Sequence, residues 1–102
     1  MAREQFQTLT EPMYYILLSL LAECCGVDIM DRVRDISGGR VGVGPGTLYT
    51  VLQKFSGNNV IRETRSEGRQ KWYIITDKGR DMLNEEQERL RRQYEDGRGL
   101  LG

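Results

Sequence analysis

The residues best suited to chemistry in this chain are hydrogen-bonding side chains within the segment 43–55, VGPGTLYTVLQKF. At about 100° per residue, a helix here directs Thr50 and Gln53 to one side, with Thr47 on the flank. Hydroxyl and amide groups can hydrogen-bond to the edges of DNA bases, and Gln can pair bidentately with adenine. A helix face that is merely solvated usually carries Glu and Lys. This small, almost uncharged face therefore indicates a surface that contacts a partner.

The same segment carries the signals of a helix start and of a buried face. Gly44 suits the N-cap, and Pro45 suits the first helical position, where its missing N–H has no partner to lose. Apolar residues then recur at i, i+3, i+4 and i+7: Leu48, Val51, Leu52 and Phe55. Tyr49 and Lys54 flank the polar face opposite. Considered alone, that face is more typical of an ordinary short polar surface than of a binding surface, so other parts of the chain must decide between the two interpretations.

A cationic cluster follows in two alternating segments, 60–66 and 69–76, which Glu67 and Gly68 join. The pattern predicts a β-hairpin with a two-residue turn. Pairing Ser66 with Arg69 anchors one face on the core through these residues: Ile61, Trp72 and Ile74. The other face and the tip then form a cationic ribbon: Arg62, Arg65, Arg69 and Lys71. Charged hairpins are also common as solvated edges that resist aggregation, so the ribbon alone leaves both interpretations open.

Composition limits the classes of function. With 102 residues and 38% hydrophobic content, we expect one domain with a modest core. Lys and Arg together number 15, as do Asp and Glu, so nucleic-acid contact must come from local clustering of charge. The chain has no histidine, no GxSxG motif and no metal-ligand cluster. We therefore expect no enzyme activity, no cofactor and no metal.

The location predicted from sequence is cytoplasmic. The longest apolar run, residues 13–21, is too short to span a bilayer, and we expect no membrane association. Adjacent Cys24 and Cys25 cannot build a disulfide framework. We expect them at the end of an apolar helix as small core residues and not as redox sensors, because no cationic neighbour in the sequence lowers a thiol pKa.

The remaining segments predict the elements that position these surfaces. Residues 1–9 form a polar arm, and a helix begins after Thr10 and stays apolar almost all round to residue 22. Either a second subunit or a central place in the monomer must cover that apolar surface, and both remain open. A second helix covers residues 27–37. A last helix runs from Thr76 or Asp77 to about Tyr94, with a tail at 96–102.

The last helix has few apolar residues, and they follow the 4-3-4 spacing typical of a helix pair: Leu83, Gln87, Leu90 and Tyr94. Three helices, a hairpin and a further helix are the order of a winged helix-turn-helix with a long C-terminal dimerisation helix. The predicted fold class is mainly α with a small β-hairpin (α+β). We expect a DNA-binding domain with its arm at 1–76, a dimerisation helix at 77–95 and a flexible tail at 96–102.

Four motifs in residues 9–90 resemble transcriptional regulators of the PadR family: LTEPMYYILLSLL, GVDIMDRV, VGPGTLYTVLQKF and KWYIITDKG. The resemblance implies a homodimeric winged-helix repressor that a small, often aromatic effector releases, with the terminal helix packed on the partner's first helix. One helix after the hairpin implies a short-type member. The sequence departs from the family pattern at two places. Cys25 and Val27 lie beside Gly26, where the family often has an aromatic residue, and Asn59 stands where the family has a glycine.

Three sets of candidate site residues follow. We expect the protein to bind double-stranded DNA at an inverted-repeat operator. The residues expected to contact this DNA are Thr47, Tyr49, Thr50, Gln53, Lys54, Arg65, Arg69 and Lys71. The expected dimerisation residues are Tyr14, Leu17, Leu83, Gln87, Leu90 and Tyr94. A small hydrophobic effector is expected near Tyr14, Tyr15 and Tyr94. The alternative function is a winged-helix module that binds proteins without specific DNA binding, since the fold alone does not imply DNA.

Overall fold

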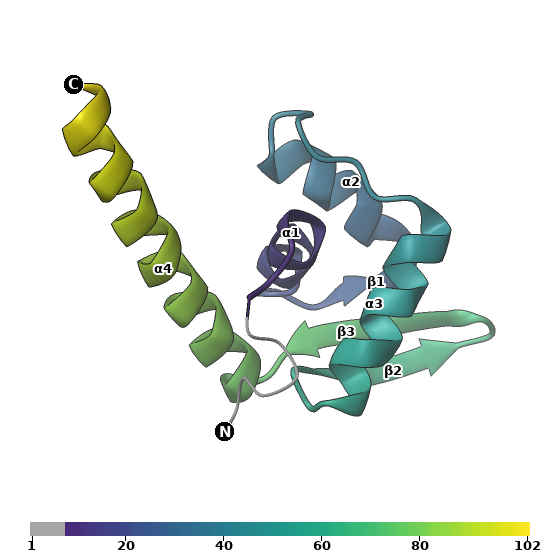
Figure 1. The fold of residues 1–102 in the computed structure, drawn as a ribbon. Coiled ribbons are helices and arrows are strands. Elements are labelled where there is room, and N and C mark those ends of the chain that lie inside the picture. Colours follow the sequence, from purple (N-terminus) through teal and green to yellow (C-terminus); the bar gives the residue numbers. More distant parts are fainter. Residues whose placement is uncertain (1–7) are drawn as a thin grey trace.

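Four helices and a three-stranded antiparallel sheet form the fold in the computed structural model, which describes residues 8–102 (Figure 1). The elements are α1 (Glu11–Ser19), β1 (Cys24–Cys25), α2 (Gly26–Ile36), α3 (Pro45–Gly57), β2 (Ile61–Glu67), β3 (Gln70–Ile75) and α4 (Asp77–Leu101). The predicted α+β winged-helix class with a long C-terminal helix is confirmed. Within residues 8–102, no helix has the length and apolar character needed to cross a membrane.

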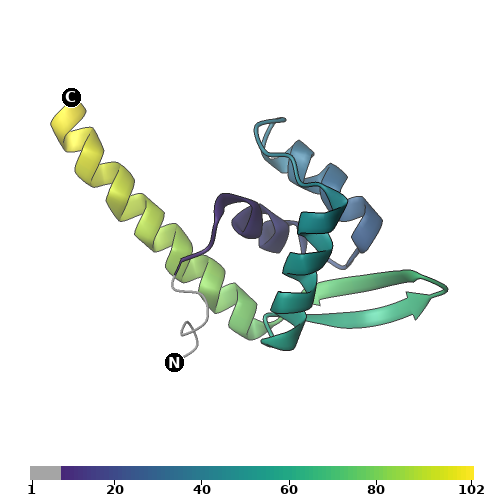
Figure 2. The same ribbon diagram turned by 45° about the vertical axis from the view of Figure 1, so that its right-hand side comes forward.

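Helix α1 lies at the centre of the fold, with α2, α3 and α4 around it (Figures 1 and 2). Thr10 caps its start, accepting a hydrogen bond from the Met13 N–H at 3.3 Å. Ile16, Leu17 and Leu20 are completely buried. The chain's own elements therefore cover most of the apolar surface of α1. The expectation that Leu17 lies at a subunit interface is wrong, because its side chain has no exposed surface to offer.

The cysteines form a strand and not the end of a helix. Helix α1 stops at Ser19, and β1 pairs antiparallel with β3, with Cys24 opposite Tyr73 and Cys25 opposite Trp72. The sheet order is β1-β3-β2, so the predicted hairpin is the outer part of a three-stranded sheet. The pairing fixes the middle of β3 to the start of α2.

Helix α3 matches its prediction. Gly44 is the N-cap and Pro45 the first helical residue, and three residues of the apolar stripe are buried: Leu48, Leu52 and Phe55. Beyond the helix, Asn59 adopts a left-handed conformation with φ of 61°, which Asn tolerates better than most residues. The chain therefore turns sharply into β2 without the glycine that the family pattern places there.

The hairpin register differs from the predicted one because β2 contains a bulge. Ser66 pairs with Lys71, and Glu67 with Gln70, so the turn is Gly68-Arg69, with Gly68 at a φ of 61°. Thr64 is the extra residue between Glu63 and Arg65. Because successive strand residues face opposite sides, one extra residue reverses the facing of everything before it.

The bulge therefore changes which residues share a face of the hairpin. Glu63 lies opposite Tyr73, and Arg62 lies opposite Ile74. The core anchors are Ile61 and Ile75, both buried, whereas Trp72 and Ile74 are only half-buried. The predicted single cationic face does not exist in this form.

The start of α4 is fastened to the base of the hairpin. The Thr76 hydroxyl accepts the Gly79 N–H at 3.1 Å, and the Thr76 N–H donates to the Val60 carbonyl at 3.0 Å. Lys78 adds a hydrogen bond from Nζ to the Asn58 carbonyl at 2.7 Å. A Cβ atom at Gly79 would lie only 2.3 Å from the Val60 oxygen. Only glycine allows this close approach.

The first turns of α4 belong to the monomer core. Met82, Leu83 and Glu86 are buried, so the expectation that Leu83 lies at a dimer seam is wrong. Glu86 pairs with Arg89 and accepts the Leu9 N–H at 3.3 Å. Leu9, predicted to belong to the arm, is thus a buried core residue. Residues 1–7 of the expected arm lie outside the described residues.

The remainder of α4 extends well away from the body of the fold (Figure 2). The helix continues to Leu101, so residues 96–101 are helical and not the expected tail. From Gln87 onward, no residue of α4 is buried. Leu90 and Tyr94 are 40% and 65% exposed, and Leu101 is 92% exposed.

Candidate nucleic-acid interface

The polar face of α3 is directed away from the core. Thr47, Thr50 and Gln53 are exposed there, and so is Lys54. Burial of Leu48, Leu52 and Phe55 on the opposite side fixes this orientation. No atom lies within 4 Å of the place where a Cβ of Gly46 would stand, so the space beside the first turn is open. The helix therefore presents a row of short hydrogen-bonding side chains with little steric obstruction.

Tyr49 occupies the side of α3 that faces α2. Its side chain is 51% exposed, and a Cβ atom at Gly26 would lie 3.6 Å from its Cε1 atom and 3.7 Å from its hydroxyl. The ring thus packs beside the first residue of α2 while part of it stays accessible. Tyr49 both joins the two helices and borders the polar face.

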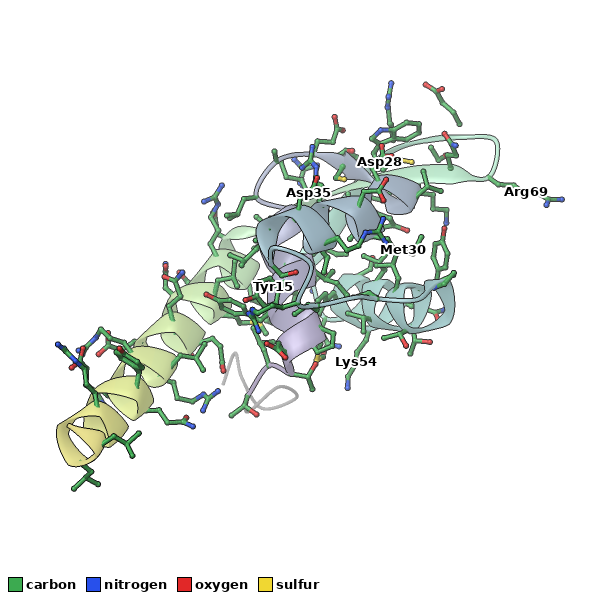
Figure 3. The ribbon with its side chains drawn as sticks, turned by 90° about the horizontal axis from the view of Figure 1, so that it is seen from above. Tyr15, Asp28, Met30, Asp35, Lys54 and Arg69 are labelled. Atoms are coloured by element: carbon green, nitrogen blue, oxygen red, sulfur yellow. The ribbon has the colours of Figure 1, made fainter. Side chains whose placement is uncertain are left out.

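The hairpin carries its charges on two faces. Lys71 lies on the face toward α3, where its Nζ is 3.7 Å from a carboxylate oxygen of Glu63. Arg69 follows the turn glycine and projects from the hairpin tip (Figure 3). Arg65 lies on the other face, where its guanidinium carbon is 3.9 Å from the centre of the Trp72 ring. The structure therefore brings Lys71 and Arg69 toward α3, but not Arg65.

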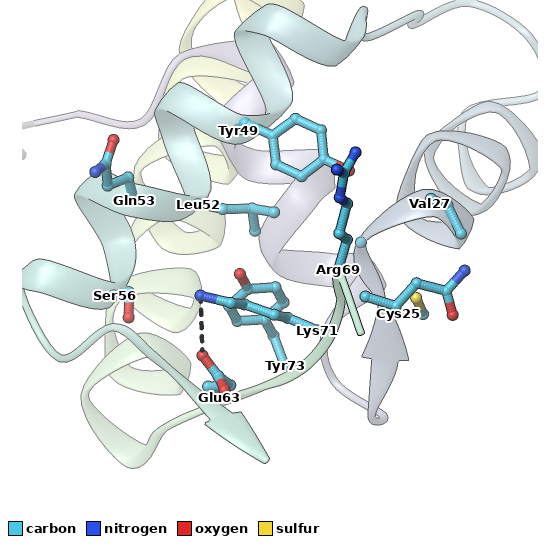
Figure 4. A pocket seen from close by; sticks show the side chains of 12 residues that line it. Cys25, Val27, Tyr49, Leu52, Gln53, Ser56, Glu63, Arg69, Lys71 and Tyr73 are labelled. Atoms are coloured by element: carbon cyan, nitrogen blue, oxygen red, sulfur yellow. Dashed lines mark ion pairs between the residues drawn. The ribbon is translucent and has the colours of Figure 1, made fainter. Parts of the chain in front are cut away.

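A cleft separates α3 from this face of the hairpin (Figure 4). Its volume is about 380 Å³, and it extends from the start of α2 to Gln53 and Ser56 on α3. Leu52 and Tyr73 supply apolar surface within it. Burial raises the pKa of the Tyr73 phenol, and the neighbouring Glu63 carboxylate raises it further. The phenol therefore keeps its proton well above neutral pH and can donate a hydrogen bond.

The residues missed from sequence at this cleft include Val27, Ser56, Glu63 and Tyr73. Glu63 shares the core-side face of β2 with Ile61, as alternation predicts, but the shifted register and the bulge at Thr64 bring Tyr73 and Lys71 onto that face in place of Trp72. Val27 and Tyr73 come from separate elements that the β1–β3 pairing brings together. No local pattern in the sequence signals either effect.

A second group of predicted residues meets between α1 and α4. Tyr14 and Tyr94 line the same surface hollow, together with Gln87 and Leu90. Tyr15 does not line it. The Tyr15 hydroxyl instead accepts a hydrogen bond from Arg40 at 2.7 Å. Of the three tyrosines expected near an effector, the structure therefore brings two together.

Both cysteines are free thiols in the core, with 3% of Cys24 and 4% of Cys25 exposed. Burial raises the pKa of the Cys24 thiol, although the Arg32 guanidinium acts in the opposite direction. A buried thiol with a raised pKa holds little reactive thiolate at neutral pH.

The arrangement of helices, sheet and exposed polar helix is that of a winged helix-turn-helix protein. The profile of the PadR-like family of transcriptional regulators matches residues 16–85, which is more than half of the chain. The chain therefore belongs to the PadR-like family. Members of this family are transcriptional regulators and not enzymes.

Solved structures agree with the fold. A PadR family transcription regulator from Clostridium difficile superimposes with a TM-score of 0.72 at 26% identity, covering 88% of this chain and 98% of that one. A transcriptional regulator from Clostridium thermocellum gives a TM-score of 0.74 at 17% identity, covering 90% and 93%. A 37.1 kDa protein in transposon TN4556 of Streptomyces fradiae is 33% identical over 61 residues. Those residues are 60% of this chain but 17% of that protein's length.

Proposed function

We propose that the protein is a cytoplasmic, homodimeric repressor that reads an inverted-repeat DNA operator. The observation that carries this proposal is the exposed row of Thr47, Thr50 and Gln53 on α3, beside a hairpin that directs Lys71 and Arg69 toward the same side. Hydroxyl and amide groups recognise base edges, whereas Lys and Arg hold phosphates. The two kinds of contact therefore come from two adjacent elements.

In this proposal α3 enters the major groove, with Gln53 as the chief reader of sequence. Lys54 at the edge of the helix and Tyr49 at its flank contact the sugar-phosphate backbone of the DNA. Lys71 must exchange its Glu63 partner for a phosphate, which costs little because both side chains of the pair are substantially exposed. Arg65, stacked on Trp72 on the far face, can reach only the DNA on that side.

The extended part of α4 supports the homodimer. Leu90 and Tyr94 belong to a 4-3-4 spacing. Because the helix continues to Leu101, the same spacing extends to Gly97 and Leu101. A heptad seam of this kind fits a second helix. Tyr14 of α1 borders the same hollow as Tyr94, so α4 of a second copy can pack there. Dimerisation would leave Leu83 in the core of each monomer and use the residues beyond it.

Two recognition helices related by a two-fold axis predict half-sites centred about 10 bp apart. The proposal includes release from DNA by a small effector. A hydrophobic effector at the dimer interface would contact Tyr14 and Tyr94, which line one hollow, whereas the Arg40 hydrogen bond directs Tyr15 elsewhere.

Two substitutions on different elements test the proposal. Gln53→Ala should cost about 1–3 kcal/mol on the cognate site and little on random DNA. Lys71→Ala should weaken binding to both alike, and should reduce the slope of log K against log salt concentration by roughly 1 for each phosphate that Lys71 neutralises. Arg62→Ala, on the opposite face of the hairpin, is the matched control and should leave both the affinity and the salt slope unchanged.

Fluorescence anisotropy with labelled duplexes at several salt concentrations measures all of these quantities. A change of sequence preference in Lys71→Ala, with none in Gln53→Ala, would mean that the hairpin, and not α3, recognises the DNA sequence. If neither variant altered DNA binding, the protein-interaction alternative would replace the proposal.

A further inference from the structure

One carboxylate lies among the side chains that line the cleft between α3 and the hairpin. Glu63 on β2 pairs with Tyr73 on β3, and Lys71 lies two residues before Tyr73 on the same side of that strand. Among the described residues that line the cleft, Glu63 is the sole acidic one, whereas Arg69 and Lys71 are cationic (Figure 4). Because DNA phosphates repel a carboxylate, Glu63 opposes the contact that its two cationic neighbours favour.

Glu63 forms an ion pair with Lys71, the hairpin cation that we propose for a DNA phosphate. A carboxylate oxygen of Glu63 lies 3.7 Å from Nζ of Lys71 (Figure 4). The exposed fractions of the two side chains are 55% for Lys71 and 41% for Glu63, so water reaches both groups and the pair can open without burying a charge. A phosphate that approaches Lys71 therefore competes with Glu63, since two anions at one ammonium group repel each other.

The backbone keeps Glu63 on the side of the cleft. Ile61, two residues earlier on the same face of β2, is buried and pairs with Ile75, so the strand cannot rotate the carboxylate to the other face. The effect on Tyr73 agrees with this placement: burial raises the pKa of the phenol, and the Glu63 carboxylate raises it further. The position of Glu63 is thus fixed by the sheet, while its exposed side chain can still turn.

We propose that Glu63 limits the affinity of the protein for DNA, because its carboxylate holds Lys71 in the free protein and competes with the DNA backbone for it. On binding, the ion pair opens, Lys71 meets a phosphate, and the Glu63 side chain turns toward solvent. The cost falls on every duplex, since phosphates are present whatever the sequence. This inference rests on the proposed function, because it requires that Lys71 contacts DNA.

Glu63→Gln removes the charge and keeps the shape of the side chain. One exposed ion pair changes an affinity by up to about fivefold, so the variant should bind random-sequence duplexes and a duplex selected from a random pool about fivefold more tightly. In the wild type the released carboxylate attracts a cation from solution, so the variant should also show a steeper slope of log K against log salt concentration, by up to about 1. A gain in affinity cannot come from unfolding.

Glu23→Gln is the matched control, because it changes the net charge by the same amount. The Glu23 carboxylate accepts a hydrogen bond from the Thr64 hydroxyl and does not line the cleft. We expect the control to change the affinity for DNA by less than about twofold. Equal gains in Glu63→Gln and Glu23→Gln would show an effect of net charge alone and would overturn the proposal.

A double-mutant cycle tests whether Glu63 acts through Lys71. In the Lys71→Ala background Glu63 has no ammonium group to hold, so Glu63→Gln should change the affinity by less than about twofold. A fivefold gain in both backgrounds would show that Glu63 repels DNA directly and would contradict the competition for Lys71. A gain on the selected duplex alone would show that Glu63 contacts a base, which also contradicts it.

A measurement without DNA separates the possible failures. The pKa of the Tyr73 phenol, followed by NMR in the free protein, should fall toward its ordinary value in Glu63→Gln but not in Glu23→Gln. If that pKa fell and Lys71→Ala weakened DNA binding, an unchanged affinity in Glu63→Gln would refute this inference alone. An unchanged affinity in Lys71→Ala would instead refute the proposed contact between Lys71 and DNA, and this inference with it.

Discussion

Replacing Gly79 with alanine should destabilise the protein through a single close contact. Gly79 is the third residue of α4, and a Cβ atom there would lie 2.3 Å from the Val60 carbonyl oxygen and 2.6 Å from Cγ1 of Ile75. The oxygen cannot withdraw freely, because it accepts hydrogen bonds from both the N–H and the hydroxyl of Thr76. Either α4 shifts away from the base of the hairpin or these hydrogen bonds weaken.

The magnitude follows from three opposing effects. Forcing a methyl group into a packed site costs about 1–3 kcal/mol, and weakening one hydrogen bond adds about 1 kcal/mol. Alanine recovers up to about 1 kcal/mol through its higher helix propensity. The net loss is about 2 kcal/mol, which for a domain of this size lowers Tm by about 8–16 °C.

Thermal unfolding followed by circular dichroism at one fixed protein concentration measures this loss, since Tm of a dimer depends on concentration. Gly99→Ala is the matched control, because nothing lies within 4 Å of its Cβ position in the same helix. We expect the control to be as stable as the wild type or slightly more so. If Gly79→Ala unfolded at the temperature of Gly99→Ala, the inferred attachment of α4 to the hairpin base would be wrong.

The remaining predictions concern assembly and redox behaviour. The double variant Leu90→Glu and Tyr94→Glu places charges on the exposed seam and not in the core, so the protein should stay folded. It should elute as a monomer in light-scattering chromatography and lose affinity for the operator. If the variant were a folded dimer, α4 would not form the dimer interface. Oxidant and reductant should leave DNA affinity equal in the wild type and in the double variant Cys24→Ser and Cys25→Ser, because both thiols are buried and the pKa of Cys24 is raised. A redox-dependent affinity present only in the wild type would identify a thiol sensor.

Local signals in the sequence are sufficient to predict α3 and the start of α4. Gly44 and Pro45 define one helix start, and Thr76 caps the other through its own side chain. The apolar stripe of α3 likewise follows from spacing alone. These features depend on residues within a turn or two of each other, which is why pattern reasoning reaches them.

Contacts between residues far apart in the sequence explain why the other predictions of the fold are wrong. The strand β1 has two residues, and only its pairing with Tyr73 and Trp72 makes it a strand. The bulge at Thr64 reverses the faces of half the hairpin, although no glycine or proline marks it. Spacing places Leu83 in the same seam as Leu90, but burial against the core separates the two. The exposed polar face of α3 therefore has the geometry that its spacing predicts, whereas the cationic hairpin face does not.

Selection of bound duplexes from a random DNA pool tests the central claim most directly. The account predicts enrichment of an inverted repeat with half-sites about 10 bp apart, and loss of one conserved position per half-site when Gln53→Ala replaces the wild type. Enrichment of an asymmetric single site would contradict the symmetric dimer. Recovery of no enriched sequence would contradict specific DNA recognition by α3.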